Sequence, residues 1–291
     1  MFSSWPSRSA VTTVSLSIVV LLLVYELVEV RLVPPPEVGI ALKNPERSQP
    51  FDTSEFTIGT YNIRYGKGLE ERPSLQQIAD VLSSPKLDVI GLNEVRLGPF
   101  SDTSQAETLA DLLDMSWVYA MTVDRYFERR AGNAILSRYH IERYEIVPLF
   151  QTQTDLAGTY ETRSRRNYVF ALLDNGEHQV AVIATHIDRG PLQPEQIDQV
   201  LRRFDQFDHA VLIGDMNNVH SQAAIAERLR DGVRDAICEG HDHEAPHIDW
   251  ILTKGFDVIE SGLHPVGISD HPQYWARLRI QQEEVEVASA L

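Results

Sequence analysis

The segment Val211-Leu212-Ile213-Gly214-Asp215-Met216-Asn217 joins a short apolar run to a polar turn. Three large aliphatic residues in succession predict a buried strand, and Gly214 allows a sharp turn that exposes the residues after it. Asp215 and Asn217 stand at positions i and i+2, so in extended backbone their side chains point the same way. A carboxylate there can orient a water or a leaving-group oxygen while the amide donates to a phosphoryl oxygen. A plain solvated Gly-Asp-x-Asn turn is the alternative.

Three more polar residues follow apolar runs in the same way. Asn62 follows the run 56–61, Glu94 follows the run 88–93, and His186 follows the run 180–185. Carboxylate and amide oxygens at strand exits suit hard cations such as Mg²⁺, and a strand-end histidine can donate to a transition-state oxygen. Each residue alone has a simpler interpretation, as a turn-capping Asn, a surface Glu and a hydrogen-bonded structural His.

Two further groups lie near the carboxyl terminus. His271 follows Asp270 in a Gly-Ile-Ser-Asp-His-Pro loop, and Asp249 begins another apolar run. An imidazole held by a carboxylate makes a general base with a fixed tautomer. No single motif is specific, but suitable side chains at the rims of so many separate strands together indicate one divalent-metal site for phosphoryl chemistry.

The wider pattern predicts an α/β (α+β) fold in four layers, with two β-sheets packed face to face and helices outside. Apolar runs bounded by turn formers predict strands at 56–61, 89–92, 134–136, 168–173, 180–185, 210–213, 250–252 and 275–280. Helical spacing of apolar residues occurs at 75–82, 107–113, 194–204 and 223–229. Helices thus alternate with strands, and no repeat of fixed period is visible. A chain of 291 residues, 43% of them hydrophobic, can hold one large domain and a short appendage, so we expect one catalytic domain.

The chain divides into four parts: a hydrophobic segment at 1–33, a proline-rich linker at 34–54, the catalytic domain at 55–281 and an acidic tail at 282–291. An uncharged stretch at 10–25 is a borderline membrane segment, because a spanning helix of about 20 residues must take in Glu26 and Glu29. A signal anchor, a cleaved signal peptide and a soluble amphipathic start are the three interpretations. The absence of an Ala-x-Ala site favours the anchor. We therefore expect membrane association with an extracytoplasmic catalytic domain, although the flanking charges specify orientation only weakly.

The charge balance argues against a general polyanion binder. The chain has 26 Lys and Arg against 42 Asp and Glu, a formal net charge of −16. Such a surface repels nucleic acid at long range, so long duplex DNA is disfavoured as a substrate without being excluded. Cys238 is the only cysteine, which precludes an intrachain disulfide and leaves the compartment open. We expect it to be a small packed side chain.

These motifs, in this order, resemble the endonuclease/exonuclease/phosphatase superfamily, the DNase I-like metal-dependent phosphoesterases. The resemblance covers about residues 55 to 281. It also includes positions with a less evident chemical role: Tyr61-Asn62-Ile63-Arg64, the run 132–138 (Gly-Asn-Ala-Ile-Leu-Ser-Arg) and Arg277. Two departures are small. Asn93 stands where Gln commonly precedes the metal-binding Glu, and Asn218 stands where a small residue is more usual.

The resemblance implies a role for each polar residue. Glu94 would be the principal ligand of Mg²⁺ or Mn²⁺, with Asn62 beside it and Asp270 helping. Asp215 and Asn217 would position the attacking water, the phosphoryl group and the leaving oxygen. The remaining roles would fall to three residues: His271 as acid/base partner of the water, Asp249 as the group that orients it, and His186 as a contact to the charged phosphoryl oxygens.

Two other clusters of polar residues are weaker candidates for binding sites. The group His241, Asp242, His243 and His247 could bind zinc, but so many candidate ligands in one short loop are more often a solvated turn. Arg163, Arg165 and Arg166 form the one dense basic patch in the sequence. Arg165 and Arg166 could grip a substrate phosphate, or the patch could simply offset local acid.

The expected activity is hydrolysis of a phosphodiester or phosphomonoester by water attack. The resemblance allows nuclease, lipid phosphodiesterase and inositol-phosphate phosphatase activities, which differ in loops and not in the metal centre. The acidic charge and the apolar segment favour a small or membrane-borne phosphoester, with a nuclease as the alternative. A catalytically inactive membrane-tethered binding module is the second alternative. No obligate protein partner is evident.

Overall fold

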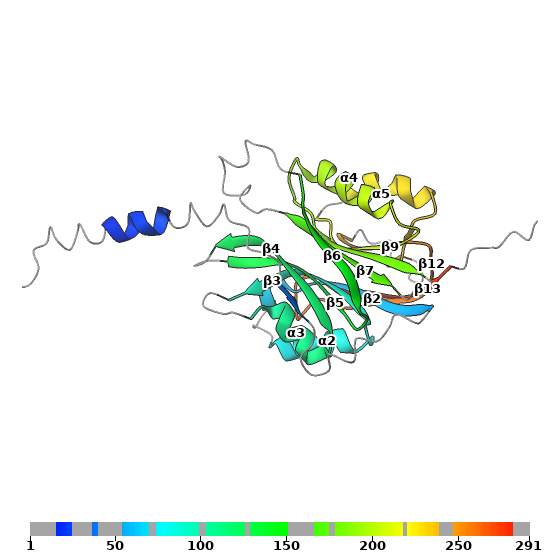
Figure 1. The fold of residues 1–291 in the computed structure, drawn as a ribbon, viewed down its shortest axis with the longest axis horizontal. Helices are drawn as coiled ribbons and strands as arrows, with labels where there is room; N and C mark the ends of the chain where they lie inside the picture. Colours follow the sequence, from blue (N-terminus) through cyan, green and yellow to red (C-terminus); the bar gives the residue numbers. More distant parts are fainter. Residues whose placement is uncertain are drawn as a thin grey trace, which may run out of the picture.

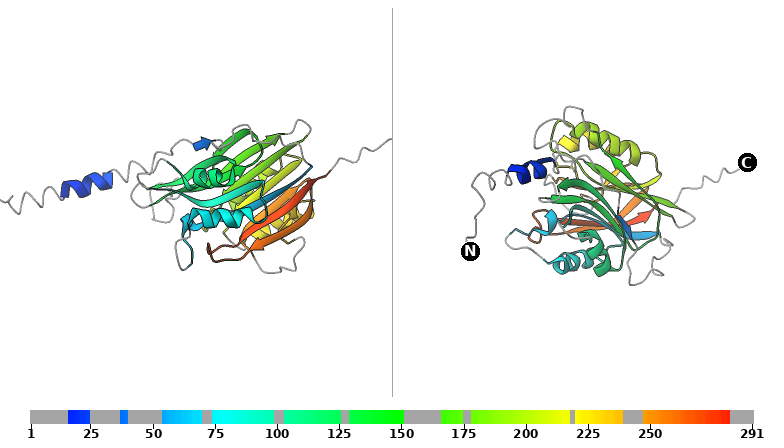
Figure 2. Two further views of the ribbon diagram at one scale, coloured as in Figure 1. Left: turned by 90° about the horizontal axis from the view of Figure 1, so that it is seen from below. Right: turned by 60° about the vertical axis from the view of Figure 1, so that its left-hand side comes forward.

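The computed structural model describes residues 16–24, 37–39, 54–69, 74–98, 103–125, 129–150, 166–174, 178–217, 220–238 and 247–281. Over these residues the chain forms two β-sheets that face each other, with helices on their outer faces (Figure 1). The right-hand view of Figure 2, turned about the vertical axis, shows the same order of layers. The expected four-layer sandwich is therefore confirmed.

Each sheet contains one parallel pair of strands, β2–β3 in one and β8–β9 in the other. The seven-stranded sheet has the order β1(Glu37–Gly39), β4(Ser116–Arg125), β5(Arg129–Ser137), β3(Val89–Leu97), β2(Glu55–Asn62), β13(Gln273–Ile280) and β12(Phe256–His264). The six-stranded sheet has the order β10(Arg234–Asp235), β11(Asp249–Lys254), β9(His209–Asp215), β8(Gln179–His186), β7(Asn167–Asp174) and β6(Ile141–Pro148).

Three apolar cores hold the layers together. The central core fills the space between the sheets and includes Ile58, Val89, Val182 and Val211. A second core packs α2(Leu75–Ser83) and α3(Gln105–Leu113) on the seven-stranded sheet, and a third packs α4(Gln193–Phe204) and α5(His220–Arg230) on the other sheet. The sheets are apolar on both faces, which is why their strands lack the polar alternation of a half-exposed sheet.

The helices form where the sequence pattern predicts them. In α4, Ile197, Val200, Leu201 and Phe204 are buried and follow the i, i+3, i+4, i+7 spacing of one helix face. A capping box starts α2: the side chain of Ser74 accepts from the backbone N–H of Gln77, whose own side chain accepts from the backbone N–H of Ser74. A short 3₁₀ turn, η2(Arg64–Gly66), follows β2.

Strands β4, β6, β10 and β12 were not among the predicted strands. Strand β6 reads Ile-Glu-Arg-Tyr-Glu-Ile-Val-Pro, and its residues are only half-buried or exposed, so it lacks an apolar run. The linker at 34–54 contains β1, which pairs with β4 at the edge of the seven-stranded sheet. Residues 16–24 are helical, and among the described residues no helix is long and apolar enough to cross a membrane.

Candidate active site

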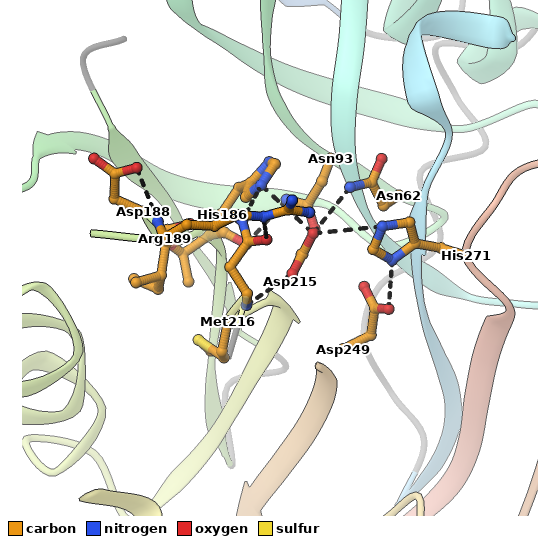
Figure 3. A network of polar contacts seen from close by, with 12 residues as sticks. Asn62, Asn93, His186, Asp188, Arg189, Asp215, Met216, Asp249 and His271 are labelled. Atoms are coloured by element: carbon orange, nitrogen blue, oxygen red, sulfur yellow. Dashed lines mark hydrogen bonds and ion pairs between the residues drawn. The ribbon is translucent and has the colours of Figure 1, made fainter. Parts of the chain in front are cut away.

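The candidate catalytic residues meet where the parallel strands of both sheets end. Asn62 is the last residue of β2 and lies opposite Asn93 of β3. In the other sheet, the last residue of β9, Asp215, lies between His186 at the end of β8 and Asp249 at the start of β11. Figure 3 shows these side chains converging from both sheets. Residues far apart in the sequence therefore form one polar cluster at one edge of the sandwich.

A β-bulge in β3 presents Glu94. Between Leu92 and Val95 the strand has two residues where its partner β5 has only Asn133, and Glu94 has a left-handed φ of 54°. A bulge bends a strand and re-aims a side chain, at a cost in backbone strain. Among the described residues, no hydrogen bond or ion pair engages the Glu94 carboxylate. An unengaged carboxylate in a strained strand fits the role of a cation ligand.

Buried amides tie the two sheets together beneath this site. Asn62 Nδ2 donates to Asp215 Oδ2 over 3.0 Å, and the Asp215 backbone N–H donates to Asn93 Oδ1 over 3.0 Å. Asn93 Nδ2 donates to Asn133 Oδ1 at 3.0 Å and to the Thr185 carbonyl at 2.9 Å. Asn133 in turn donates to Asn167 Oδ1 at 3.1 Å. This ladder of Asn93, Asn133 and Asn167 was missed as a functional element, although Asn93 and Asn133 stand inside the motifs.

His271 forms a pair with Asp249. Its Nδ1 lies 2.7 Å from Asp249 Oδ2, while its Nε2 lies 3.7 Å from Asp215 Oδ2. Burial lowers the pKa of His271, but the hydrogen bond to Asp249 and the charges of Asp249, Asp215 and Asp270 outweigh burial and raise that pKa to about 9. At neutral pH the ring therefore carries a proton on each nitrogen, and the Nε2–H faces the site.

Asp215 is held in an environment that disfavours its charge. It is 1% exposed, and burial followed by the nearby Asp249 raises its pKa to about 7. Hydrogen bonds from Asn62 and from the Asn217 backbone, together with His271, act in the opposite direction. A carboxyl group with a pKa near 7 can exchange a proton with a reacting water at physiological pH.

His186 and Asn217 bind each other in this structure. The Asn217 Nδ2 group lies 2.7 Å from His186 Nε2 and donates to the Ile187 carbonyl over 2.9 Å. Burial, and then the charges of Arg166, His271 and Arg189, lower the pKa of His186 well below its ordinary value. His186 is therefore neutral, and its Nε2 accepts from the amide. To donate to a phosphoryl oxygen, as the sequence pattern suggests, the Asn217 amide must give up one of these two bonds.

Two arginines stand near this pair. Arg189 Nε donates to Asn217 Oδ1 over 2.5 Å, and an Arg166 nitrogen lies 3.9 Å from Asp188 Oδ1. Arg189 was not among the predicted residues, because a single Arg after His-Ile-Asp carries no recognisable signal. Arg163 and Arg165, like the run His241, Asp242 and His243, lie outside the described residues.

Asp270 lies at the rim of the site. Its Oδ2 is 3.2 Å from Arg64 Nε, and its side chain is 39% exposed. The preceding residue, Ser269, donates from Oγ to the Asn62 carbonyl at 2.7 Å and so fixes this loop on the end of β2.

The described residues contain side-chain groups that could hold a divalent cation. Asp215, Asp249 and His271 have ligand atoms that all lie within 4.8 Å of one another. Glu94 and Asp270 belong to no such group of His, Cys, Asp and Glu in the described part of the chain. Asn62 Oδ1 accepts from the Arg64 backbone N–H at 3.0 Å and keeps a second lone pair for a cation. The donor set, carboxylate and amide oxygens, is the kind that Mg²⁺ and Mn²⁺ prefer.

The chain is similar to known proteins in both sequence and fold. The model of the Endonuclease/Exonuclease/phosphatase family matches residues 59–271. The uncharacterized protein YbhP of Escherichia coli K12 is 32% identical over 111 residues, which are 35% of this chain and 42% of that protein. The chain thus matches less than half the length of this relative.

Solved structures share the fold. An endonuclease/exonuclease/phosphatase from Beutenbergia cavernae superposes with a TM-score of 0.65 at 26% identity, over 78% of this chain and 72% of the other. The D. rerio TDP2 complex with a single strand DNA product gives a TM-score of 0.58 at 15% identity, over 78% of this chain and all of the other, a likeness of fold alone. The chain belongs to the endonuclease/exonuclease/phosphatase family.

Proposed function

We propose that this enzyme hydrolyses a small or membrane-borne phosphodiester or phosphomonoester by metal-dependent attack of water. The observation that carries the proposal is the buried group Asp249–His271–Asp215, joined through Asn62 to the strand end that presents Glu94. A phosphoester hydrolase needs a proton acceptor for water, donors for the phosphoryl oxygens and charge compensation, and this cluster holds candidates for all three.

Glu94 and Asn62, with Asp270 at the rim, are the residues that would hold Mg²⁺ or Mn²⁺. When bound, such a cation offsets the negative charge that develops on the phosphoryl oxygens. The unengaged Glu94 carboxylate and the free lone pair on Asn62 Oδ1 support this assignment.

Asp215 and His271 are the groups that accept and donate protons in this proposal. Asp215, with a pKa raised to about 7, is the better acceptor for the proton of the attacking water. His271, with a pKa raised to about 9, keeps its Nε2–H at neutral pH and can donate to a phosphoryl or leaving-group oxygen. Asp249 holds the imidazole in this orientation. His186 and Asn217 supply a second amide and imidazole group on the other side of Asp215, where Arg166 and Arg189 attract the anionic substrate.

Substrate size and location are inferred from charge and apolar surface. The net charge of −16 opposes a long polyanion, which supports a small phosphoester over nucleic acid. The helix at 16–24 exposes a row of large aliphatic side chains, with Leu16 at 66% and Leu21 at 68%, which supports membrane association through the N-terminal part. A nuclease is the second candidate, favoured by the arginines Arg64, Arg166 and Arg189 around the site.

The test is a substrate panel with the purified full chain. Plasmid DNA, single-stranded oligonucleotides, sphingomyelin vesicles and inositol phosphates are each incubated with Mn²⁺ or Mg²⁺, with His271→Ala as the inactive control. We expect turnover of lipid or small phosphoesters that His271→Ala abolishes. Cleavage of DNA alone, again dependent on His271, identifies a nuclease. Binding of a substrate with no turnover by the wild type identifies the inactive binding module.

A further inference from the structure

A second cluster of potential ligands lies apart from the catalytic group. Asp235, at the end of β10, Cys238, in the turn after it, and His247, just before β11, have ligand atoms that all lie within 4.8 Å of one another. The closest pair is His247 Nε2 and Asp235 Oδ2, at 3.1 Å. Cys238 is exposed, contrary to the expectation of a packed side chain. Of these three residues, only His247 is a candidate zinc ligand in the sequence, because Asp235 and Cys238 lie upstream of the histidine-rich run.

The geometry points to a binding site for a thiophilic divalent cation of the zinc type, held by Asp235 Oδ2, Cys238 Sγ and His247 Nε2. Bond lengths of about 2.0 to 2.3 Å from zinc to oxygen, nitrogen and sulfur require ligand atoms a few ångströms apart, which is the spacing found here. Thiolate and imidazole select zinc-like cations over Mg²⁺. The fourth position of a tetrahedral ion would remain for water or another ligand.

The burial and hydrogen bonding of the His247 ring support this site independently of the distances between ligand atoms. The His247 side chain is 8% exposed, and its Nε2 lies 3.1 Å from Asp235 Oδ2, but the angles of this contact are not those of a hydrogen bond, and Nε2 has no other hydrogen-bond partner in the described part of the chain. A buried ring nitrogen without such a bond is unfavourable unless something else engages it. The ring also packs against Trp250, with centroids 4.4 Å apart and planes tilted by 50°.

The turn that carries Asp235 and Cys238 is preorganised. Asp235 Oδ1 accepts from the Ile237 backbone N–H at 3.1 Å, and the Cys238 N–H donates to the Asp235 carbonyl at 3.2 Å. One carboxylate oxygen is therefore occupied by the turn, while the other faces His247. Partial burial of the sulfur, and then the Asp235 carboxylate, raise the pKa of the Cys238 thiol to about 12.

A cation bound by Asp235, Cys238 and His247 would hold in place the segment that carries the catalytic residue Asp249. His247 and Asp249 are separated by Ile248, whose carbonyl accepts from the Met216 backbone N–H at 2.7 Å. Fixing His247 to the β10 turn therefore fixes the segment that presents Asp249 to His271. The role is structural and does not depend on the proposed substrate.

The test is cobalt binding to the reduced full chain, because Co²⁺ replaces zinc and shows a thiolate-to-metal charge-transfer band. Cys238 is the only cysteine, so any such band reports on this site and not on the catalytic one. We expect one equivalent of Co²⁺ to give the band and zinc to displace it. Cys238→Ser should abolish the band, and His247→Gln and Asp235→Asn should each weaken binding at least tenfold.

The matched control is His140→Gln, since His140 also lies near a carboxylate, 3.7 Å from Glu142, but on the exposed surface. It should bind cobalt like the wild type. Zinc should also raise the melting temperature of the wild type by more than that of Cys238→Ser, which keeps only the ligands of the catalytic group. A folded, reduced wild type that shows no charge-transfer band with Co²⁺, or a band that His247→Gln and Asp235→Asn leave unchanged, overturns the proposal and leaves His247 and Asp235 as a simple ion pair.

Discussion

At the scale of single residues, the catalytic group depends on carboxylates placed close together in a buried site. Asp215 and Asp249 lie side by side on neighbouring strands, and His271 contacts both. Two carboxylates this close cannot both remain charged without cost, so the protonated imidazole between them is part of the stable arrangement. The altered pKa values of Asp215 and His271 follow from this arrangement.

The first prediction concerns Asp249→Asn. The change removes the charge and the strong hydrogen bond that raise the pKa of His271, so that pKa should fall from about 9 toward or below its ordinary value. We expect kcat/KM at pH 7.5 to drop at least about 100-fold, the usual scale for a misplaced acid or base. The pH–rate profile and NMR titration of the His271 ring provide the measurement. An unchanged alkaline limb would show that Asp249 does not set this pKa.

The second prediction concerns the stability of Asp215→Asn as a function of pH. The folded pKa of Asp215 is about 7, above its ordinary value of 3.8. As pH rises between these values the unfolded chain ionises this group while the folded chain does not, so the wild type loses stability, and the loss is complete above pH 7. The variant lacks this loss. Its melting temperature relative to wild type should therefore increase from pH 5 to pH 8, even though its activity is lost. A difference that stays flat, or falls, contradicts the assignment.

At the scale of elements, most of the fold could be predicted from the sequence. Helices α2 to α5 and the buried strands of both parallel pairs follow from apolar spacing, because their burial is uniform or regular. Strand β6, exposed and charged, carries no such signal. The bulge that presents Glu94 and the Asn93–Asn133–Asn167 ladder could not be predicted, since both depend on which strands become neighbours. The need for glycine at position 132 is explained only by the structure, because a Cβ there would lie 2.0 Å from the Ala120 carbonyl oxygen.

The candidate active site could be predicted only in part, because the sequence shows which residues end a strand but not which strands become neighbours. The strand-end residues could be named individually, because each follows an apolar run. Their mutual distances could not, and the pairing of His186 with Asn217, the role of Arg189 and the group at Asp235, Cys238 and His247 became visible only in three dimensions.

The third prediction concerns Gly214→Ala. Gly214 has a φ of +132°, and a Cβ there would lie 1.9 Å from the Thr185 carbonyl oxygen on the neighbouring strand. The substitution should lower the free energy of unfolding by about 2 kcal/mol or more, through strain and displacement of β9 from β8, and should reduce activity by moving Asp215. Gly190→Ala is the matched control, because its Cβ meets nothing within 4 Å. Urea denaturation measures both. Equal stability of the two variants contradicts the close packing of β8 on β9.

At the scale of the whole molecule, the catalytic sandwich is closed by contacts within residues 55–281. The pairing of β2 with β13 joins the two ends of this range inside the seven-stranded sheet. The parts outside it contribute little to the described structure: β1 has three residues and lies at a sheet edge. Folding should therefore be independent of the N-terminal part.

The fourth prediction follows from this architecture. A fragment of residues 51–291 should be soluble, melt cooperatively and hydrolyse a soluble phosphodiester with a kcat/KM within about threefold of the full chain. The loss of β1 removes only three paired residues, so the cost in stability should be on the order of 1 kcal/mol. Circular dichroism and an activity assay provide the measurements. Aggregation or inactivity, under conditions in which the full chain is active, would mean that residues 1–50 are part of the fold.

The central claim, that Glu94 and His271 belong to one metal-dependent hydrolytic site, is tested most directly by one assay. The full chain, Glu94→Gln and His271→Ala are compared on a bis-aryl phosphodiester with Mg²⁺ or Mn²⁺ and with EDTA. We expect wild-type turnover that EDTA abolishes and metal restores, with each variant at least about 100-fold slower. Glu94→Gln should also need more metal for half-maximal rate. Turnover that persists in EDTA, or wild-type rates in either variant, would contradict the account.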